Sequence, residues 1–197
     1  MLDERKKSGI LTPVKQARQA AETTTLLVAF LFFFELLEIV LRTNFNHLGI
    51  MPRTIVGLRG IIFSPFLHFN AAHLLANAVS LWVLLFLLFW ERTYRPTEVL
   101  LTIWLFSGLG AWLIGRPAVH IGASSIVYGL ATYLLFAAYW IRSWRTLLIA
   151  LLTFVLYGGI FHGALPQGGA VSWEGHLSGA IAGFWSARKA HKKKSRA

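Results

Sequence analysis

The chain has 197 residues, of which 56% are hydrophobic and 14% are charged, and its formal net charge is +11. A soluble domain is roughly 45–50% apolar and about 25% charged, so the surplus of apolar side chains indicates lipid surroundings, while basic residues clustered between apolar runs argue against a nucleic-acid-binding surface. The sequence has no cysteine, which excludes a disulfide framework, a thiolate metal site and a cysteine nucleophile, and its only aspartate is Asp3.

Six apolar runs are long enough, or nearly so, to cross a bilayer, which takes about 20 mostly apolar residues. In chain order they are 25–41, 71–90, 97–115, 122–141, 146–161 and 173–187. Residues 1–24 are polar and basic and have no cleavage site, so we expect a basic cytoplasmic segment there rather than a removable signal. The sequence therefore predicts an all-α membrane protein with a six-helix core at 25–187 and a basic tail at 188–197.

The basic residues also predict the orientation of these helices. Lys and Arg in short flanking segments stay on the cytoplasmic side of a membrane. With the N-terminus inside, fifteen of the nineteen Lys and Arg fall on that side. Both termini are therefore predicted to be cytoplasmic, with the tail on anionic lipid headgroups. The second, fourth and sixth helices then all begin at the outer side, so residues near their starts share one depth.

Polar residues gather at these three starts. His73 and Asn77 lie one turn apart on the second helix and can donate hydrogen bonds to a common point, although such pairs also join helices without further function. The fourth helix opens with Ser124 and Ser125, where free N–H groups favour an anion, but either serine can also be a simple cap. His176 opens the sixth helix and can equally be a satisfied interhelical residue.

Glycine spacing connects the last two starts. Gly175, Gly179 and Gly183 are four residues apart and form a groove for close contact with the fourth helix, which would bring His176 toward Ser124. A serine, a base and extra donors are the components of an acyl-transfer site. No aspartate lies near His176, and Glu174 points to a different helical face, so we expect a Ser–His dyad whose ring is held by packing.

The order and placement of three motifs resemble the rhomboid family of intramembrane serine proteases. The resemblance covers roughly residues 25–187, and residues 63–68 are also similar to the family's first loop where it returns to the membrane. The three motifs are HLLAN at 73–77, GASS at 122–125 followed by Tyr128, and GHLSGAIAG at 175–183.

This resemblance implies a six-transmembrane-helix rhomboid-like bundle and a role for each motif residue. Ser124 would be the nucleophile and His176 the general base and then acid. His73 and Asn77, with the Ser124 backbone N–H, would hold the oxyanion, and Tyr128 would be the aromatic residue against which the catalytic His packs. The implied reaction is cleavage of transmembrane segments of membrane proteins near the outer face through an acyl-enzyme, with no cofactor and no metal.

The implied partners are transmembrane protein substrates and membrane lipids, and the implied location is a prokaryotic plasma membrane, with a multi-pass chain. Two positions depart from the family pattern: Ser125 stands where the family usually has glycine, and Leu58-Arg59-Gly60 stands where a Trp-Arg pair is often seen. The main alternative is a catalytically silent rhomboid-like protein that binds membrane helices. A small transporter is less favoured, because the polar residues cluster at one depth.

Other intramembrane proteases are excluded, since the sequence has no His-Glu-x-x-His string and no membrane-embedded aspartate. The glycine-rich stretch 157–170 is expected to be a movable cap over the site, unless it is an ordinary connection. His162 lies within it, and we do not expect it to be catalytic. On the first helix, the spacing of Glu38 and Arg42 favours an ion pair, with a bond from Glu38 to the following loop as the second choice.

Overall fold

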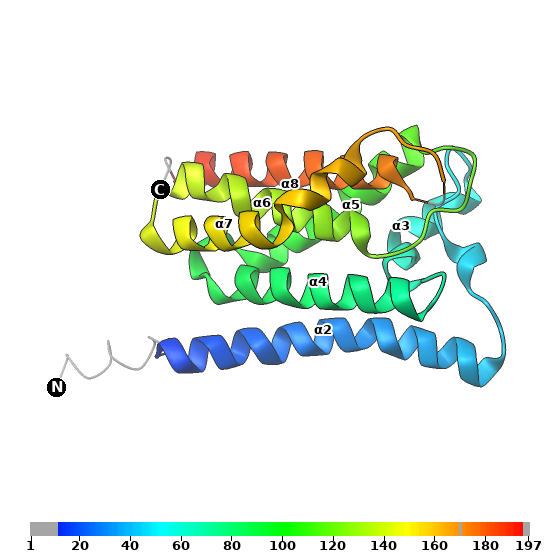
Figure 1. Ribbon diagram of the computed structural model, residues 1–197, viewed down its shortest axis with the longest axis horizontal. Helices are drawn as coiled ribbons and strands as arrows, with labels where there is room; N and C mark the ends of the chain where they lie inside the picture. Colours follow the sequence, from blue (N-terminus) through cyan, green and yellow to red (C-terminus); the bar gives the residue numbers. More distant parts are fainter. Residues whose placement is uncertain (1–11, 170, 195–197) are drawn as a thin grey trace.

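The computed structural model describes residues 12–169 and 171–194, and within them the fold is entirely helical. Figure 1 shows the long helices running side by side in a bundle, with the start of α2 and the end of α8 at the same end. Short 3-10 helices and one-turn helices occupy the connections. The helices are α2 (Pro13–Leu41), α3 (Gly60–Phe63), α4 (Ala71–Trp90), α5 (Pro96–Ile114), α6 (Ser124–Ile141), α7 (Trp144–Tyr157) and α8 (Trp173–Lys194).

Helix α6 is the centre of the bundle. It packs against α4, α5, α7 and α8, whereas α2 packs at one edge against α4. Leu130, Ala131, Tyr133 and Leu134 of α6 are fully buried. The helix that carries the predicted nucleophile at its first residue is therefore the one that the rest of the fold encloses.

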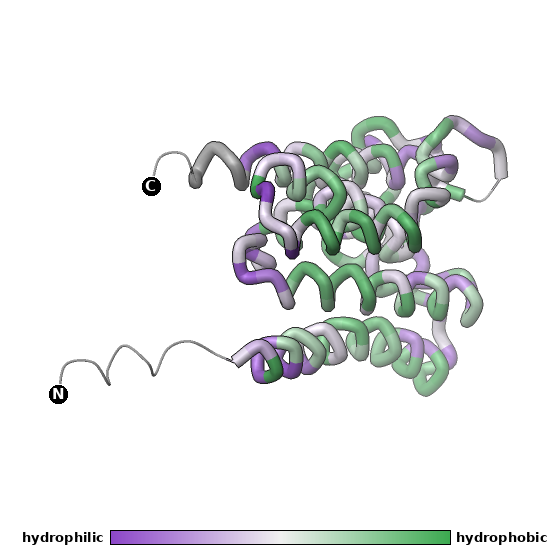
Figure 2. Tube along the Cα trace, turned by 60° about the vertical axis from the view of Figure 1, so that its left-hand side comes forward, coloured by the Kyte–Doolittle hydropathy of each residue, from purple (hydrophilic) through white to green (hydrophobic). Residues whose placement is uncertain are grey.

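The predicted apolar runs correspond to the long helices, and five of these are long and apolar enough to cross a membrane. The five are α2, α4, α5, α6 and α7 with its continuation to Ala164. Figure 2 shows hydrophobic stretches along the helices and hydrophilic residues toward their ends. Helix α8 is not among the five, because its glycines, serines and basic residues dilute its apolar content. The chain is an integral membrane protein.

Helix α8 continues to Lys194, past the predicted end at 187, and two further helix boundaries also differ from the predicted runs by more than two residues. Helix α2 begins twelve residues before the first run, because Thr12 caps the N–H of Lys15 and Pro13 suits the first helical position. The described part of the polar segment 1–24 is therefore largely helical, and residues 1–11 lie outside the described residues. At the other boundary, α7 ends at Tyr157, and the chain continues as the 3-10 helix η5 (Gly158–Ala164).

The expected ion pair between Glu38 and Arg42 does not form in this part of the chain. Arg42 adopts a left-handed conformation (φ 48°) that ends α2 and turns the chain back. The Glu38 carboxylate then accepts a hydrogen bond from the backbone N–H of Phe45 at 2.6 Å. The sequence's first prediction, the ion pair, is therefore wrong, and the second, a bond from Glu38 to the following loop, is confirmed.

The close approach of α6 and α8 depends on glycine, as the spacing of four predicts. A Cβ atom at Gly179 would overlap the carbonyl oxygen of Ser125, and one at Gly183 would overlap that of Gly129. The two backbones therefore touch without intervening side chains. This contact sets the first turn of α8 beside the first turn of α6.

The loop between α2 and α4 supports the segment that leads into α6. Ile50 and His120 exchange backbone hydrogen bonds at 3.0 and 2.9 Å. The backbone N–H of Gly122 donates to the carbonyl of Ser64 at 2.8 Å, and Arg53 donates to the carbonyl of Gly115 at 2.9 Å. The approach to Ser124 is therefore held along most of its length.

Candidate active site

The first turns of α6 and α8 bring Ser124 and His176 into hydrogen-bond contact. His176 Nε2 lies 2.8 Å from Ser124 Oγ, although 52 residues separate them in the sequence. The imidazole is buried and the serine is half-buried. The two side chains therefore stand at the distance that proton transfer from a serine nucleophile to a histidine base requires.

The other ring nitrogen of His176 contacts a backbone carbonyl. Nδ1 lies 2.9 Å from the carbonyl oxygen of Gly163, in η5. A carbonyl oxygen only accepts, so Nδ1 carries the proton and Nε2 of the neutral ring presents its lone pair to the Ser124 hydroxyl. The carbonyl thus selects the tautomer that can act as a base, a task that an aspartate performs in a triad.

Tyr128 packs against the same imidazole. The two rings are stacked with centroids 4.1 Å apart and planes 9° apart. The Tyr128 hydroxyl donates to the carbonyl of Ile160 at 2.5 Å. One side chain therefore holds the plane of the His176 ring and also fastens η5 above it.

His73 and Asn77 converge on Gly122, two residues before Ser124. A Cβ atom built at Gly122 would lie 2.9 Å from His73 Nε2 and 3.5 Å from Asn77 Nδ2. Gly122 also has a φ of +104°, so both its conformation and its neighbours require glycine. One N–H of Asn77 donates to the carbonyl of His73 at 3.1 Å, which leaves the other for a ligand.

Ser124 is the first residue of α6, so its N–H is among the donors that a helix leaves unpaired. The helix dipole favours negative charge at this end. Together with the side chains beside Gly122, this N–H can stabilise an oxyanion formed next to the Ser124 hydroxyl.

Two neighbouring polar residues face elsewhere. Ser125 Oγ accepts a hydrogen bond from Ser107 Oγ of α5 at 3.3 Å. The Glu174 carboxylate pairs with Arg116, 2.8 Å away, on the side of α8 opposite to the dyad, as its position on the helix predicts. His162 is exposed and its Nδ1 contacts the carbonyl of Gly159, outside the dyad. Among the described residues, no group of three His, Asp or Glu side chains is arranged to hold a metal ion.

His68 is a neighbouring residue for which the sequence predicts no role in the site. It lies between η3 (Ser64–Phe66) and α4, is 3% exposed, and its ring meets that of His73 edge to face at 5.1 Å. Neither ring nitrogen makes a well-formed hydrogen bond within the described part of the chain. Burial lowers the pKa of His68 to about 4 and outweighs the nearby Phe66 backbone, which favours the charged form. His68 is therefore neutral at pH 7.

Comparisons with known proteins give matches over most of the chain. The family model described as the rhomboid domain matches residues 56–193. The uncharacterized proteins Rv1337 of Mycobacterium tuberculosis and Mb1372 of Mycobacterium bovis are each 40% identical over 184 residues, which cover 88% of this chain and 77% of theirs. The uncharacterized protein ML1171 of Mycobacterium leprae is 37% identical over 170 residues, covering 81% of this chain and 67% of its own. No solved structure matches the chain.

Proposed function

The chain belongs to the rhomboid family, and we propose that it is an intramembrane serine endopeptidase that cleaves transmembrane segments of membrane proteins near the outer face. The observation that carries the proposal is the 2.8 Å contact between Ser124 Oγ and His176 Nε2, on a ring whose Nδ1 is held by the Gly163 carbonyl. This contact favours a protease over a catalytically silent helix-binding relative, for which the tautomer of His176 would be immaterial.

The chemistry follows from these contacts. His176 Nε2 takes the proton of Ser124 as Oγ attacks the carbonyl carbon of the scissile bond. His73, Asn77 and the Ser124 N–H stabilise the oxyanion. His176 then gives its proton to the leaving amine, and the C–N bond breaks to leave an acyl-enzyme. Water, deprotonated by the same imidazole, then attacks the ester carbonyl; the bond to Ser124 Oγ breaks as the imidazolium returns the proton to that oxygen, and the carboxylic acid product leaves. Neither half of the reaction needs a cofactor.

We also propose that α8 is a sixth crossing and that both termini are cytoplasmic. Helix α8 lies alongside α5 and α6, and its end is at the same end of the bundle as the start of α2 (Figure 1). The groups around the dyad lie at the starts of α4, α6 and α8, away from that end. The mycobacterial relatives support a prokaryotic plasma membrane.

A substrate helix has to unwind before the dyad can reach it, because its peptide carbonyls are engaged in its own hydrogen bonds. Small or helix-breaking residues near the outer face make this unwinding less costly. The stretch 157–170, whose residue 170 lies outside the described residues, is the candidate cap, because its carbonyls at Ile160 and Gly163 contact Tyr128 and His176. A side chain at Gly159 or Gly168 would meet no neighbour, and a glycine-rich stretch of this kind is suited to act as a movable cap.

The test is labelling by a fluorophosphonate probe in detergent. Ser124→Ala should abolish labelling, and His176→Ala should reduce it sharply. Ser125→Ala is the matched control, since the Ser125 hydroxyl contacts Ser107 and not the imidazole, and it should still label. Labelling that persists in Ser124→Ala would contradict the proposal. A protein that binds a transmembrane helix in liposomes but neither labels nor cleaves would support the silent alternative.

A further inference from the structure

Arg116 lies in the connection between α5 and α6 and reaches the first turn of α8. Its Nε is 2.8 Å from Glu174 Oε1, and its backbone N–H donates to the same oxygen at 3.2 Å. The Glu174 side chain is 1% exposed, and its other oxygen has no partner among the described residues. Glu174 stands two residues before His176, so this contact fixes the turn of α8 that carries the base.

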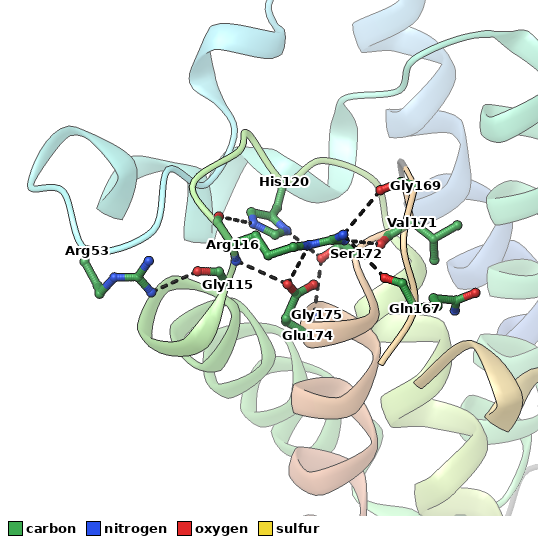
Figure 3. Close-up of polar contacts among 10 residues, drawn as sticks. All are labelled: Arg53, Gly115, Arg116, His120, Gln167, Gly169, Val171, Ser172, Glu174 and Gly175. Carbon is green, nitrogen blue, oxygen red and sulfur yellow. Dashed lines mark hydrogen bonds and ion pairs between the residues drawn. The ribbon is translucent and has the colours of Figure 1, made fainter. Parts of the chain in front are cut away.

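The remaining nitrogens of the guanidinium contact the end of the candidate cap and Val171, which follows it. They donate to the carbonyl oxygens of Val171 at 2.5 Å and of Gln167 and Gly169 at 3.4 Å each. Figure 3 shows the guanidinium between these carbonyls and the Glu174 carboxylate. A planar group with five N–H donors can make all these contacts at once, whereas the compact ammonium of lysine cannot.

His120 adds a second connection from the same segment to α8. Its Nε2 lies 3.0 Å from the carbonyl of Arg116, which only accepts, so Nε2 carries the proton. Nδ1 therefore accepts from the Ser172 hydroxyl at 2.6 Å. The same Ser172 oxygen accepts the N–H of Gly175 at 3.3 Å and so caps the start of α8.

These contacts join three parts of the site. The segment that carries Arg116 leads within eight residues to Ser124, the first turn of α8 carries His176, and the cap carries the Gly163 carbonyl. Gln167, which accepts from Arg116 through its carbonyl, also donates from Nε2 to the carbonyl of Gly163 at 3.3 Å. Arg116 is therefore linked to His176 in two ways: through Glu174 to the helix turn that carries it, and through Gln167 and the Gly163 carbonyl to Nδ1 of its ring.

We propose that Arg116 is a positioning residue for the dyad, which holds α8 at the depth and rotation where Nε2 meets Ser124 and holds the cap where the Gly163 carbonyl meets Nδ1. The inference rests on the proposed function. A dyad without an acidic third member has no charged partner that draws the ring back into place. Displacing reacting groups by about 1 Å can cost on the order of 10²-fold in rate, so the anchor matters even though it touches no substrate.

The experiment compares three variants with the full-length protein. Arg116→Lys keeps a cation for Glu174 but loses the carbonyl contacts. Arg116→Ala combined with Glu174→Gln removes the guanidinium without leaving a buried, unpaired carboxylate, which would endanger folding. Arg59→Lys is the matched control, because Arg59 is also an outer-loop arginine that donates to a carbonyl, that of His47, away from the dyad.

We expect kcat for cleavage of a transmembrane substrate in liposomes to fall about tenfold in Arg116→Lys and about a hundredfold in the double variant, with KM unchanged. Fluorophosphonate labelling should slow in parallel, and Arg59→Lys should match the wild type. Thermal unfolding in detergent corrects every rate for the folded fraction, so a purely structural role would leave kcat of the folded protein unchanged.

A spectroscopic readout separates this inference from the activity itself. In protein with 15N-labelled histidine, the His176 signals, identified by their loss in His176→Gln, should report a protonated Nδ1 in the wild type and mixed tautomers in both Arg116 variants. If the folded variants keep the wild-type tautomer and the wild-type kcat, the inference is wrong. If the wild type neither labels nor cleaves, the proposed function fails, and the tautomer signals alone decide the role of Arg116.

Discussion

Replacing Asn77 with alanine tests the oxyanion site most directly, because the structure separates the two tasks of this side chain. One N–H donates to the carbonyl of His73, four residues earlier in α4, and the other is directed to the space beside Gly122. The first task concerns stability and the second concerns the transition state. A measurement that resolves unfolding from turnover can therefore assign a magnitude to each.

The first bond is a neutral contact between a side chain and the backbone, so its loss should lower the free energy of unfolding by about 1 kcal/mol. Loss of one preorganised oxyanion donor costs about 10²–10³-fold in kcat, or roughly 3–4 kcal/mol of transition-state stabilisation. KM should change little, because the donor is used fully only once the carbonyl oxygen carries charge. The assays are cleavage of a transmembrane substrate in liposomes and thermal unfolding in detergent.

Ser186→Ala is the matched control for this experiment. The Ser186 hydroxyl also donates to a carbonyl four residues earlier, that of Ala182, but in the second half of α8, more than two turns beyond His176. Its replacement should reproduce the loss of stability without the loss of turnover. Equal kcat values for Asn77→Ala and Ser186→Ala would refute the oxyanion role.

Three further predictions concern the surroundings of the dyad. Tyr128→Phe keeps the stacking on His176 and loses only the bond to Ile160, so kcat should stay within about threefold of the wild type. Tyr128→Ala should lower kcat about tenfold or more, because the His176 ring loses its orientation. Equal rates in the two variants would contradict a stacking role. Gly179→Ala forces α8 away from α6, so it should lower the free energy of unfolding by about 1–3 kcal/mol and reduce labelling by the probe. Gly168→Ala, where a side chain would meet no neighbour, should change neither. Unchanged unfolding and labelling in Gly179→Ala would disprove the tight contact. Burial lowers the pKa of His68 from 6.5 to about 4, so the stability that its neutral form supports is complete above pH 6.5 and is lost as the pH falls toward 4, by about 3 kcal/mol in all. In His68→Asn the free energy of unfolding should therefore depend less steeply on pH between 4 and 6.5. An unchanged dependence would argue against a buried, neutral His68.

The sequence predicted the helices and the glycine contact because both leave a regular pattern. Apolar runs of sufficient length indicate helices in lipid, and Gly179 and Gly183 at a spacing of four indicate a close neighbour. The start of α2 was not predicted, because an apolar run indicates only the part of a helix that lies in lipid. The helix itself extends further, through polar residues to the cap at Thr12. The bond from Glu38 to Phe45 depends on the reversal at Arg42, which the spacing of charges does not reveal.

Within the site, residue types could be predicted but backbone partners could not. Ser124 and His176 are recognisable because a hydroxyl or an imidazole inside a membrane is energetically costly and therefore indicates a function. The Gly163 carbonyl has no such signature, since every residue carries a carbonyl and only the path of η5 brings this one to His176. Arg116 has no recognisable partner in the sequence, because the groups that it contacts are a carboxylate and three carbonyls more than 50 residues away.

The placement of charge around the dyad has a consequence for catalysis. A carboxylate at Nδ1 would stabilise the imidazolium with a full charge, but removing it from water at membrane depth carries a large desolvation cost. Here the buried carboxylate of Glu174 is turned away and neutralised by Arg116, and Nδ1 meets only the dipole of a carbonyl. Less of the charge separation in the transition state is therefore stabilised at the base, and more of it must be stabilised at the oxyanion. For this reason we expect the loss of Asn77 to reduce turnover at least as much as the loss of the Tyr128 ring.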